Sequence, residues 1–89
     1  MATTRVDVVT PSGLLYSGQA EMVVCRATSG DIAFLANHMP YVGTLEAHPV
    51  RVVHPDGGPD ELSFDVDGGF VEVNANHVVV LASTAGRQP

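Results

Sequence analysis

The chain has 89 residues, enough for one domain with a thin core, because a chain of this length buries only about 60–65% of the surface that it exposes when unfolded. Its formal net charge is −6, with four Lys and Arg residues against ten Asp and Glu residues. This balance excludes a nucleic-acid partner, which needs clustered basic side chains, and it disfavours direct lipid insertion. An apolar fraction of 45% is high for so small a chain and favours a protein that a partner covers.

The start of the chain lacks the apolar stretch of a signal peptide, and no apolar run approaches the roughly 18 residues of a spanning helix. We therefore expect a soluble, unexported protein. The only cysteine, Cys25, excludes an internal disulfide.

Apolar and polar residues alternate along most of the chain, with turn residues at intervals of about eight to twelve positions, which predicts an all-β sandwich or barrel of short strands. A helix over residues 32–45 is excluded because Pro40 and Gly43 would interrupt it. One domain is expected over residues 1–85, followed by a frayed tail over 86–89. The predicted strands cover residues 5–10, 14–17, 19–27, 31–35, 41–45, 50–54, 62–67, 70–73 and 77–82.

Two short segments carry structural predictions. In the segment Asn37-His38-Met39-Pro40, Pro40 favours extended geometry at Met39 and Asn37 favours a turn, so His38 is expected to tie that turn to nearby backbone by a hydrogen bond. Gly68-Gly69 permits a bulge or a sharp change of direction between the strands on either side.

Residues 77–82 are apolar on both faces of the predicted strand, although a one-sided antiparallel sheet should alternate. If Val71 and Val73 point inward on the preceding strand, Phe70 points outward and joins Val79 on an outer apolar patch. Either another sheet of the same sandwich or a partner protein covers this patch.

No residues suggest catalysis, a cofactor or a metal. The histidines are not paired at ligand spacing, and Cys25 alternates with inward-facing residues as a small core side chain does. Asp65 and Asp67 share one strand face, which a solvated surface explains. The four histidines are His38, His48, His54 and His77.

Several fragments, in chain order, resemble the N-terminal domain of the epsilon subunit of F-type ATP synthases, which is called delta in mitochondria. The sequence departs from that pattern at Ala33, where a glycine is usual, and at Asp31, where glutamate is usual. The turn after Leu45 also differs. The matching fragments are Tyr16-Ser17-Gly18, Gly30-Asp31-Ile32, His38-Met39-Pro40 with Leu45, residues 67–73, and Val80-Leu81-Ala82 with Ala85.

The resemblance implies a flattened ten-stranded β-sandwich of two mostly antiparallel sheets. It also implies a non-catalytic rotor subunit at the foot of the central stalk, on the cytoplasmic face of the bacterial plasma membrane, that helps couple proton flow to ATP synthesis. The family normally continues into a hairpin of two helices that restrains hydrolysis. That hairpin would begin where these 89 residues end, so its roles are not carried over.

The implied partners are the gamma subunit and the polar loops of the c-ring, which typically carry an arginine. The alternative function is a free-standing β-sandwich that binds a small ligand or a signalling protein; an enzyme ranks third. The implied c-ring contacts are Ser29, Gly30, Asp31 and Ile32; the implied gamma contacts are Val42, Phe70 and Val79; and the structural residues are His38, Pro40, Gly68 and Gly69.

Overall fold

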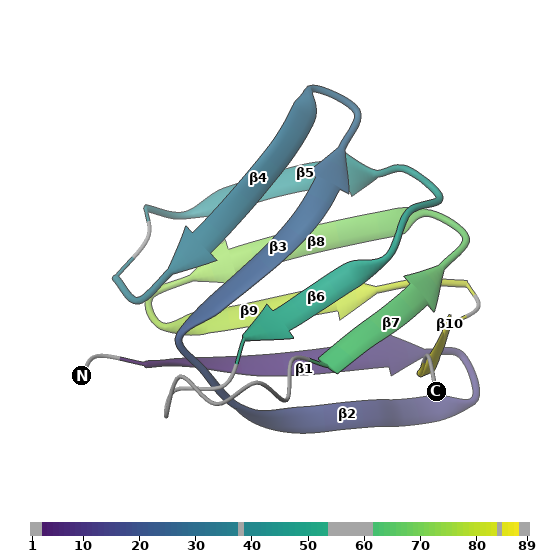
Figure 1. The fold of residues 1–89 in the computed structure, drawn as a ribbon, viewed down its shortest axis with the longest axis horizontal. Helices are drawn as coiled ribbons and strands as arrows, with labels where there is room; N and C mark the ends of the chain where they lie inside the picture. The colour runs from purple at the N-terminus through teal and green to yellow at the C-terminus, as the bar shows by residue number, and fades with distance from the viewer. Residues whose placement is uncertain (1–2, 38, 54–61, 84, 88–89) are drawn as a thin grey trace.

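A computed structural model describes residues 3–37, 39–53, 62–83 and 85–87, the last three by their backbone (Figure 1). His38 and His54 lie outside the described residues. The strands are β1 (Thr4–Thr10), β2 (Gly13–Ala20), β3 (Met22–Ala27), β4 (Gly30–Leu35), β5 (Tyr41–Leu45), β6 (Val50–Val53), β7 (Leu62–Val66), β8 (Gly69–Asn74), β9 (His77–Leu81) and β10 (Ala85–Arg87). The prediction of an all-β fold is confirmed.

The strands form one continuous hydrogen-bonded sheet rather than the two separate sheets that were expected. Its order is β10-β7-β6-β3-β5-β8-β9-β1-β2, with β4 pairing to β3. The sheet curls so that β4, β3, β6 and β7 cross in front of β5, β8 and β9 in Figure 1. The two layers stay connected because Ala27, the last residue of β3, pairs with Leu45 at the end of β5.

Most pairings are antiparallel, but β1 and β9 are parallel, from Arg5 opposite His77 to Val9 opposite Leu81. Strand β9 also pairs antiparallel with β8. The layer β5-β8-β9-β1-β2 is therefore assembled from both ends of the chain, and β1 and β9 lie inside it rather than at an edge.

The core lies between the two layers and takes alternate residues from each strand. This is the geometry that the alternating sequence predicts, because successive side chains of a strand point to opposite faces. Tyr16 packs on Phe64 with ring centroids 5.4 Å apart, and Phe34 packs on Tyr41 at 5.6 Å. The fully buried side chains include Val6, Val8, Val23, Phe34, Val50, Val52, Phe64, Val71, Val78 and Val80.

Several strand boundaries differ from prediction, and two of the differences change the strand pattern. The predicted strand 19–27 is divided at Glu21, whose backbone N–H donates to the Val53 carbonyl at 2.9 Å. Residues 86 and 87, expected in a frayed tail, pair with β7 as part of β10. The sequence Ala85-Gly86-Arg87 has no alternation of apolar and polar residues, so its pairing depends on β7 offering a free edge.

The two turns that flank β8 use left-handed backbone conformations. Gly68 and Gly69 have φ values of 120° and 130°, a region that glycine occupies without strain. At the other end, Asn76 at φ 60° closes the turn to β9, and its side-chain Oδ1 accepts a hydrogen bond of 2.6 Å from the backbone of Asn37. The β4–β5 connection is thus held to the β8–β9 turn by Asn37.

Gly69 has a second constraint, because a Cβ atom there would lie 2.0 Å from the Leu81 carbonyl oxygen. Gly13 has a similar φ of 132° but nothing within 4 Å of its Cβ position. We expect Gly13→Ala to cost about 1–3 kcal/mol of unfolding free energy from backbone strain, and Gly69→Ala to cost about 1–3 kcal/mol more from the overlap. Urea denaturation of both variants measures this difference; equal destabilisation would contradict it.

Candidate functional site

The outer surface of the β5-β8-β9-β1-β2 layer carries an unusual number of apolar side chains. Strand pairing aligns them, because directly paired residues share one face of a sheet. Leu14 is opposite Val9, Val9 is opposite Leu81, and Leu81 is opposite Phe70, so one apolar row crosses β2, β1, β9 and β8. We call Val9, Leu14, Val42, Phe70, Val79 and Leu81 the apolar face.

Much of the apolar face is open to solvent. Val42 is 70% exposed, Leu14 60%, Phe70 55% and Leu81 44%, while Val79 is half-buried among them. Fully burying a side chain of this kind contributes about 1.5–3 kcal/mol. Exposed apolar patches on small proteins mark sites of association, so this face is suited to docking on another protein.

Grooves adjoin the apolar face at two places. One is lined by Val9, Pro11, Phe70 and Leu81, with Thr10, Gly69, Ala82 and Ser83. The other lies against Val42 and includes Pro40, Tyr41, Glu72, Val73 and Asn74. Side chains that protrude from a partner would fit into these two grooves.

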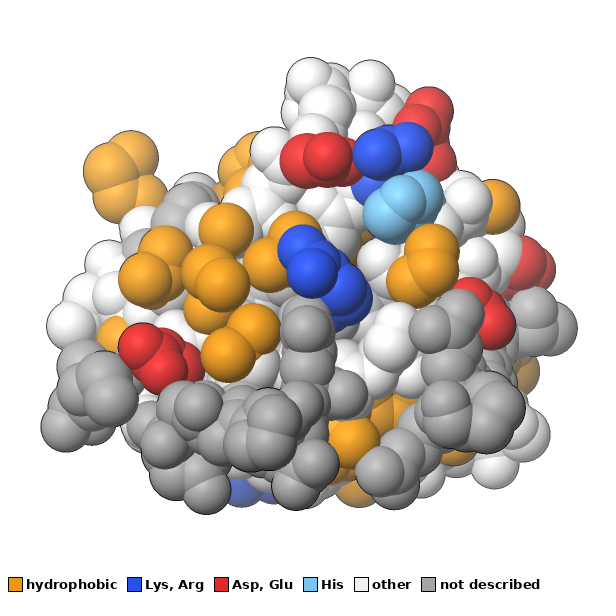
Figure 2. Space-filling model, viewed as in Figure 1, with side chains coloured by type: hydrophobic (Ala, Val, Ile, Leu, Met, Phe, Trp, Pro, Cys, Tyr) orange, Lys and Arg blue, Asp and Glu red, His pale blue; other side chains and the backbone are white. Residues whose placement is uncertain are grey.

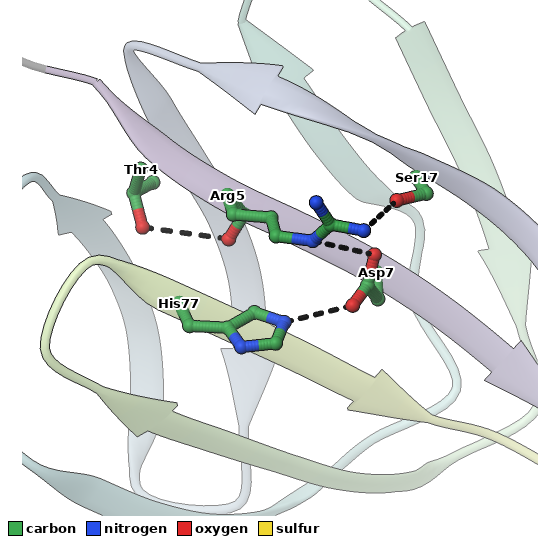
Figure 3. A network of polar contacts seen from close by, with 5 residues as sticks. All are labelled: Thr4, Arg5, Asp7, Ser17 and His77. Carbon is green, nitrogen blue, oxygen red and sulfur yellow. Dashed lines mark hydrogen bonds and ion pairs between the residues drawn. The ribbon is translucent and has the colours of Figure 1, made fainter.

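A polar cluster borders the apolar face on β1, β2 and β9 (Figure 3). His77 Nε2 donates to Asp7 Oδ2 at 2.7 Å, and Arg5 Nη2 donates to Ser17 Oγ at 2.9 Å. Arg5 Nε lies 3.5 Å from Asp7 Oδ1. Asp7 is directly opposite Val79 in the parallel β1–β9 pair, so the cluster fixes the charged groups beside the centre of the apolar face.

The pKa of Asp7 is lowered below its ordinary value of 3.8, mainly by the Ser17 hydroxyl. Partial desolvation opposes the shift, while the hydrogen bond from His77 and the charge of Arg5 reinforce it. Because the folded-state pKa is depressed, this ionised carboxylate stabilises the fold above the unfolded pKa, and the contribution is lost as the pH falls through the folded-state pKa.

The second candidate region is the end of the β3–β4 hairpin with the residue that follows β5. Arg26 and Asp31 are directly opposite each other on β3 and β4. Arg26 Nε donates to Asp31 Oδ1 at 2.7 Å, and Nη2 lies 3.4 Å from Oδ2. The hydrogen bond from Arg26 is the main cause that lowers the pKa of Asp31, and Asp31 in turn raises the pKa of Arg26. We call Arg26, Asp31 and Glu46 the charged tip.

The predicted c-ring residues take different positions. Ser29 and Gly30 are exposed at the hairpin turn, with Gly30 at φ 128°. Asp31 is exposed and is paired with Arg26. We did not predict this pair from the sequence. The two-residue turn between Ala27 and Gly30 would have predicted it, because it places the two residues opposite each other. Ile32 is half-buried and packs against the core, so its side chain does not extend outward with Asp31.

The predicted gamma residues Val42, Phe70 and Val79 share one face, as expected. They lie on adjacent strands, with Val42 opposite Glu72 and Glu72 opposite Val79. Sequence reasoning missed Val9, Leu14 and Leu81. The signal for them is weak, because a register shift in the β1–β2 pair and the long-range parallel β1–β9 pair determine their positions.

A second apolar surface covers the outer side of β3, β4 and β6 and was not predicted. Figure 2 shows it as a group of hydrophobic side chains beside basic ones. Leu35 is 52% exposed there. Met22 is directly opposite both Leu35 and Val53, and Val24 is opposite Ala33, so these five residues share one face.

The described residues give no support for metal or nucleophilic chemistry. They contain no group of three His, Cys, Asp or Glu side chains placed to hold a metal ion. Burial raises the pKa of the Cys25 thiol to about 12, so the reactive thiolate is disfavoured at neutral pH. Within the same residues, no helix is long and apolar enough to cross a bilayer.

Comparisons with known proteins agree with this geometry. Residues 3–88 match the family described as the ATP synthase delta/epsilon chain, β-sandwich domain. The chain is 46% identical over 85 residues to an ATP synthase epsilon chain of Brevibacillus brevis and 44% identical over 85 residues to one of Bacillus subtilis. Those matches cover 96% of this chain and 63% and 62% of the relatives, so it spans about three fifths of their length.

Solved structures share the fold at lower sequence identity. A chain of the Euglena gracilis mitochondrial ATP synthase, in an OSCP/F1/c-ring structure, superimposes with a TM-score of 0.88 at 19% identity, covering 98% of this chain and 54% of that one. A chain from the central stalk and c-ring of the Tetrahymena thermophila mitochondrial ATP synthase gives 0.73 at 14% identity, covering 92% and 64%.

The polar cluster yields a pH-dependent prediction. We expect Asp7→Asn to lower the unfolding free energy at pH 7 by about 1–2 kcal/mol, because it removes an acceptor of charge-assisted hydrogen bonds. The difference from the parent should shrink as the pH falls below 3.8 toward the lower folded-state pKa of Asp7, because protonation of Asp7 in the parent removes the same interaction. Urea denaturation from pH 7 to pH 3 measures it, with the exposed Glu72→Gln on the same face as control. A difference that is constant with pH would contradict the assignment.

Proposed function

The chain belongs to the family of ATP synthase delta and epsilon chains through their β-sandwich domain, and on this basis we propose that it is a non-catalytic rotor subunit of a bacterial F-type ATP synthase. In this role it joins the gamma subunit to the c-ring and helps couple proton translocation to ATP synthesis. It acts at the cytoplasmic face of the membrane, held there by the complex. The apolar face is the observation that carries the proposal, because it provides a surface suited to docking on another protein.

The apolar face is the proposed contact with the gamma subunit. Four of its side chains are at least 44% exposed, and burying their remaining exposed area against a partner contributes a corresponding part of the about 1.5–3 kcal/mol gained on burying a whole side chain. The Arg5–Asp7–His77 cluster borders the face with polar groups, and Glu72 lies between Val42 and Val79 within it. An apolar centre with a polar rim is the usual anatomy of a protein interface.

The charged tip is the proposed contact with the c-ring. The polar loops of the ring typically carry an arginine in this family, which suits an acidic tip on a chain of net charge −6. Asp31 is 61% exposed, and an exposed ion pair contributes only about 0–1 kcal/mol. The tip would therefore orient the domain on the ring, while the apolar face supplies most of the affinity for the rotor.

Transmission of torque requires the contact surfaces to move as one body. The apolar face and the charged tip belong to one sheet, and β5 links them directly: Val42 lies on the apolar face, and Glu46 follows the last residue of the same strand. Backbone hydrogen bonds of 2.9 Å, from Thr28 to Thr44 and from Glu46 to Arg26, hold the hairpin end against β5. A load applied at the tip is thereby carried into the layer that bears the apolar face.

The gamma contact is tested by placing a charge in the apolar face. We expect Phe70→Asp or Val79→Asp to weaken binding to a purified bacterial gamma subunit by at least about tenfold, because each removes a buried apolar side chain and desolvates a carboxylate. Isothermal titration calorimetry of the parent and variants measures the affinity.

The matched control is Leu35→Asp, which changes a side chain of similar exposure on the other apolar surface. It should bind gamma as the parent does. The proposed contact is wrong if the Phe70 and Val79 variants remain folded by circular dichroism and bind gamma as tightly as the parent. It is also wrong if Leu35→Asp alone loses binding.

A further inference from the structure

The carboxylate of Asp31, the acid proposed to meet the c-ring, is already occupied by a guanidinium of its own chain. Arg26 contacts both carboxylate oxygens of Asp31, at 2.7 and 3.4 Å. The two residues are directly opposite each other on β3 and β4, so the backbone pairing itself holds them together. A cationic group on a partner must therefore share or replace the guanidinium of Arg26.

A second carboxylate lies on the other side of Arg26. Ala27 pairs with Leu45, and the backbone N–H of Glu46 donates to the Arg26 carbonyl at 2.9 Å, so Glu46 lies next to Arg26 across the β3–β5 junction. Glu46 is exposed, and its charge contributes to raising the pKa of Arg26. In Figure 2 a basic side chain lies between acidic ones at the upper end of the molecule, the end at which the β3–β4 turn lies in Figure 1.

Hydrogen bonds hold the backbone around Arg26, Asp31 and Glu46 in place. An exchange of ion-pair partners would therefore move the side chains alone. The hydrogen bond from Thr28 to Thr44 closes the hairpin turn onto β5. Arginine has a long side chain with several donors, and a guanidinium can satisfy either of two neighbouring carboxylates. His48 and Arg51 are the other basic side chains near Asp31.

We propose that Arg26 competes with the cationic group of the c-ring for Asp31, and that Glu46 receives the guanidinium of Arg26 when the ring takes its place. This inference rests on the proposed ring contact and identifies two residues that set its strength. After this exchange Asp31 pairs with the ring and Arg26 pairs with Glu46, so the net gain is a single exposed ion pair. The contact would therefore remain weak and readily reversible, and would orient the domain without locking it.

The test measures binding of the chain to a purified bacterial c-ring in detergent, by biolayer interferometry at low salt. We expect Arg26→Gln to bind about two- to fivefold more tightly, since it frees Asp31, and Glu46→Gln to bind more weakly by a similar factor, the size typical of exposed ion pairs. Asp31→Asn should weaken binding, and adding Arg26→Gln to it should produce no gain. Raised salt should reduce the differences.

The possible outcomes separate this inference from the proposed function. Competition is refuted if Arg26→Gln weakens binding as Asp31→Asn does, because Arg26 would then support the contact, and the role of Glu46 is refuted if Glu46→Gln matches the parent. If parent and Asp31→Asn bind the ring equally or not at all, the ring contact itself fails. As an independent readout, the pKa of Asp31, followed by NMR in the free chain, should rise toward 3.8 in Arg26→Gln.

Discussion

The fold and its proposed binding surface both depend on the pairing of β9 along its two edges. Strand β8 pairs with it antiparallel and β1 pairs with it parallel. Val78 and Val80 enter the core, while Val79 and Leu81 form part of the apolar face. Because β9 contributes side chains both to the core and to the apolar face, its position in the sheet fixes the geometry of both. Gly69 permits the close approach at the Leu81 carbonyl that this arrangement requires.

The two proposed contacts use different physics, and the difference fits the work of a rotor subunit. An apolar face gains free energy in proportion to the area that it buries, so it suits a lasting attachment to the shaft. A charged tip on the surface gains little, responds to salt and can exchange its partners. The pairing of Arg26 with Asp31 sharpens this contrast, because the acid proposed to meet the ring is already paired with a guanidinium in the free domain. In this proposal, orientation and affinity are assigned to neighbouring parts of one sheet that meet at β5.

Alternation along the chain was sufficient to predict an all-β fold and the outward direction of Phe70 and Val79, because side-chain direction within a strand is a local property. Contacts between strands were harder to predict from the sequence. The position of Leu14 depends on a register shift, and the single curled sheet depends on one bridge between β3 and β5. The pairing of Arg26 with Asp31 could have been predicted from the sequence, since a two-residue hairpin turn fixes its register. Strand β10 carries no pattern and forms where β7 offers an edge.

The central claim is that the apolar face is covered in the assembled complex while the opposite apolar surface is not covered by the same partner. Thiol labelling of Val42→Cys and Leu35→Cys tests it, since both side chains are more than half exposed in the free domain and Cys25 is buried. The account predicts equal labelling of both variants in the free chain and, after binding the gamma subunit, loss of labelling at position 42 alone. Continued labelling at position 42 in the complex would contradict it.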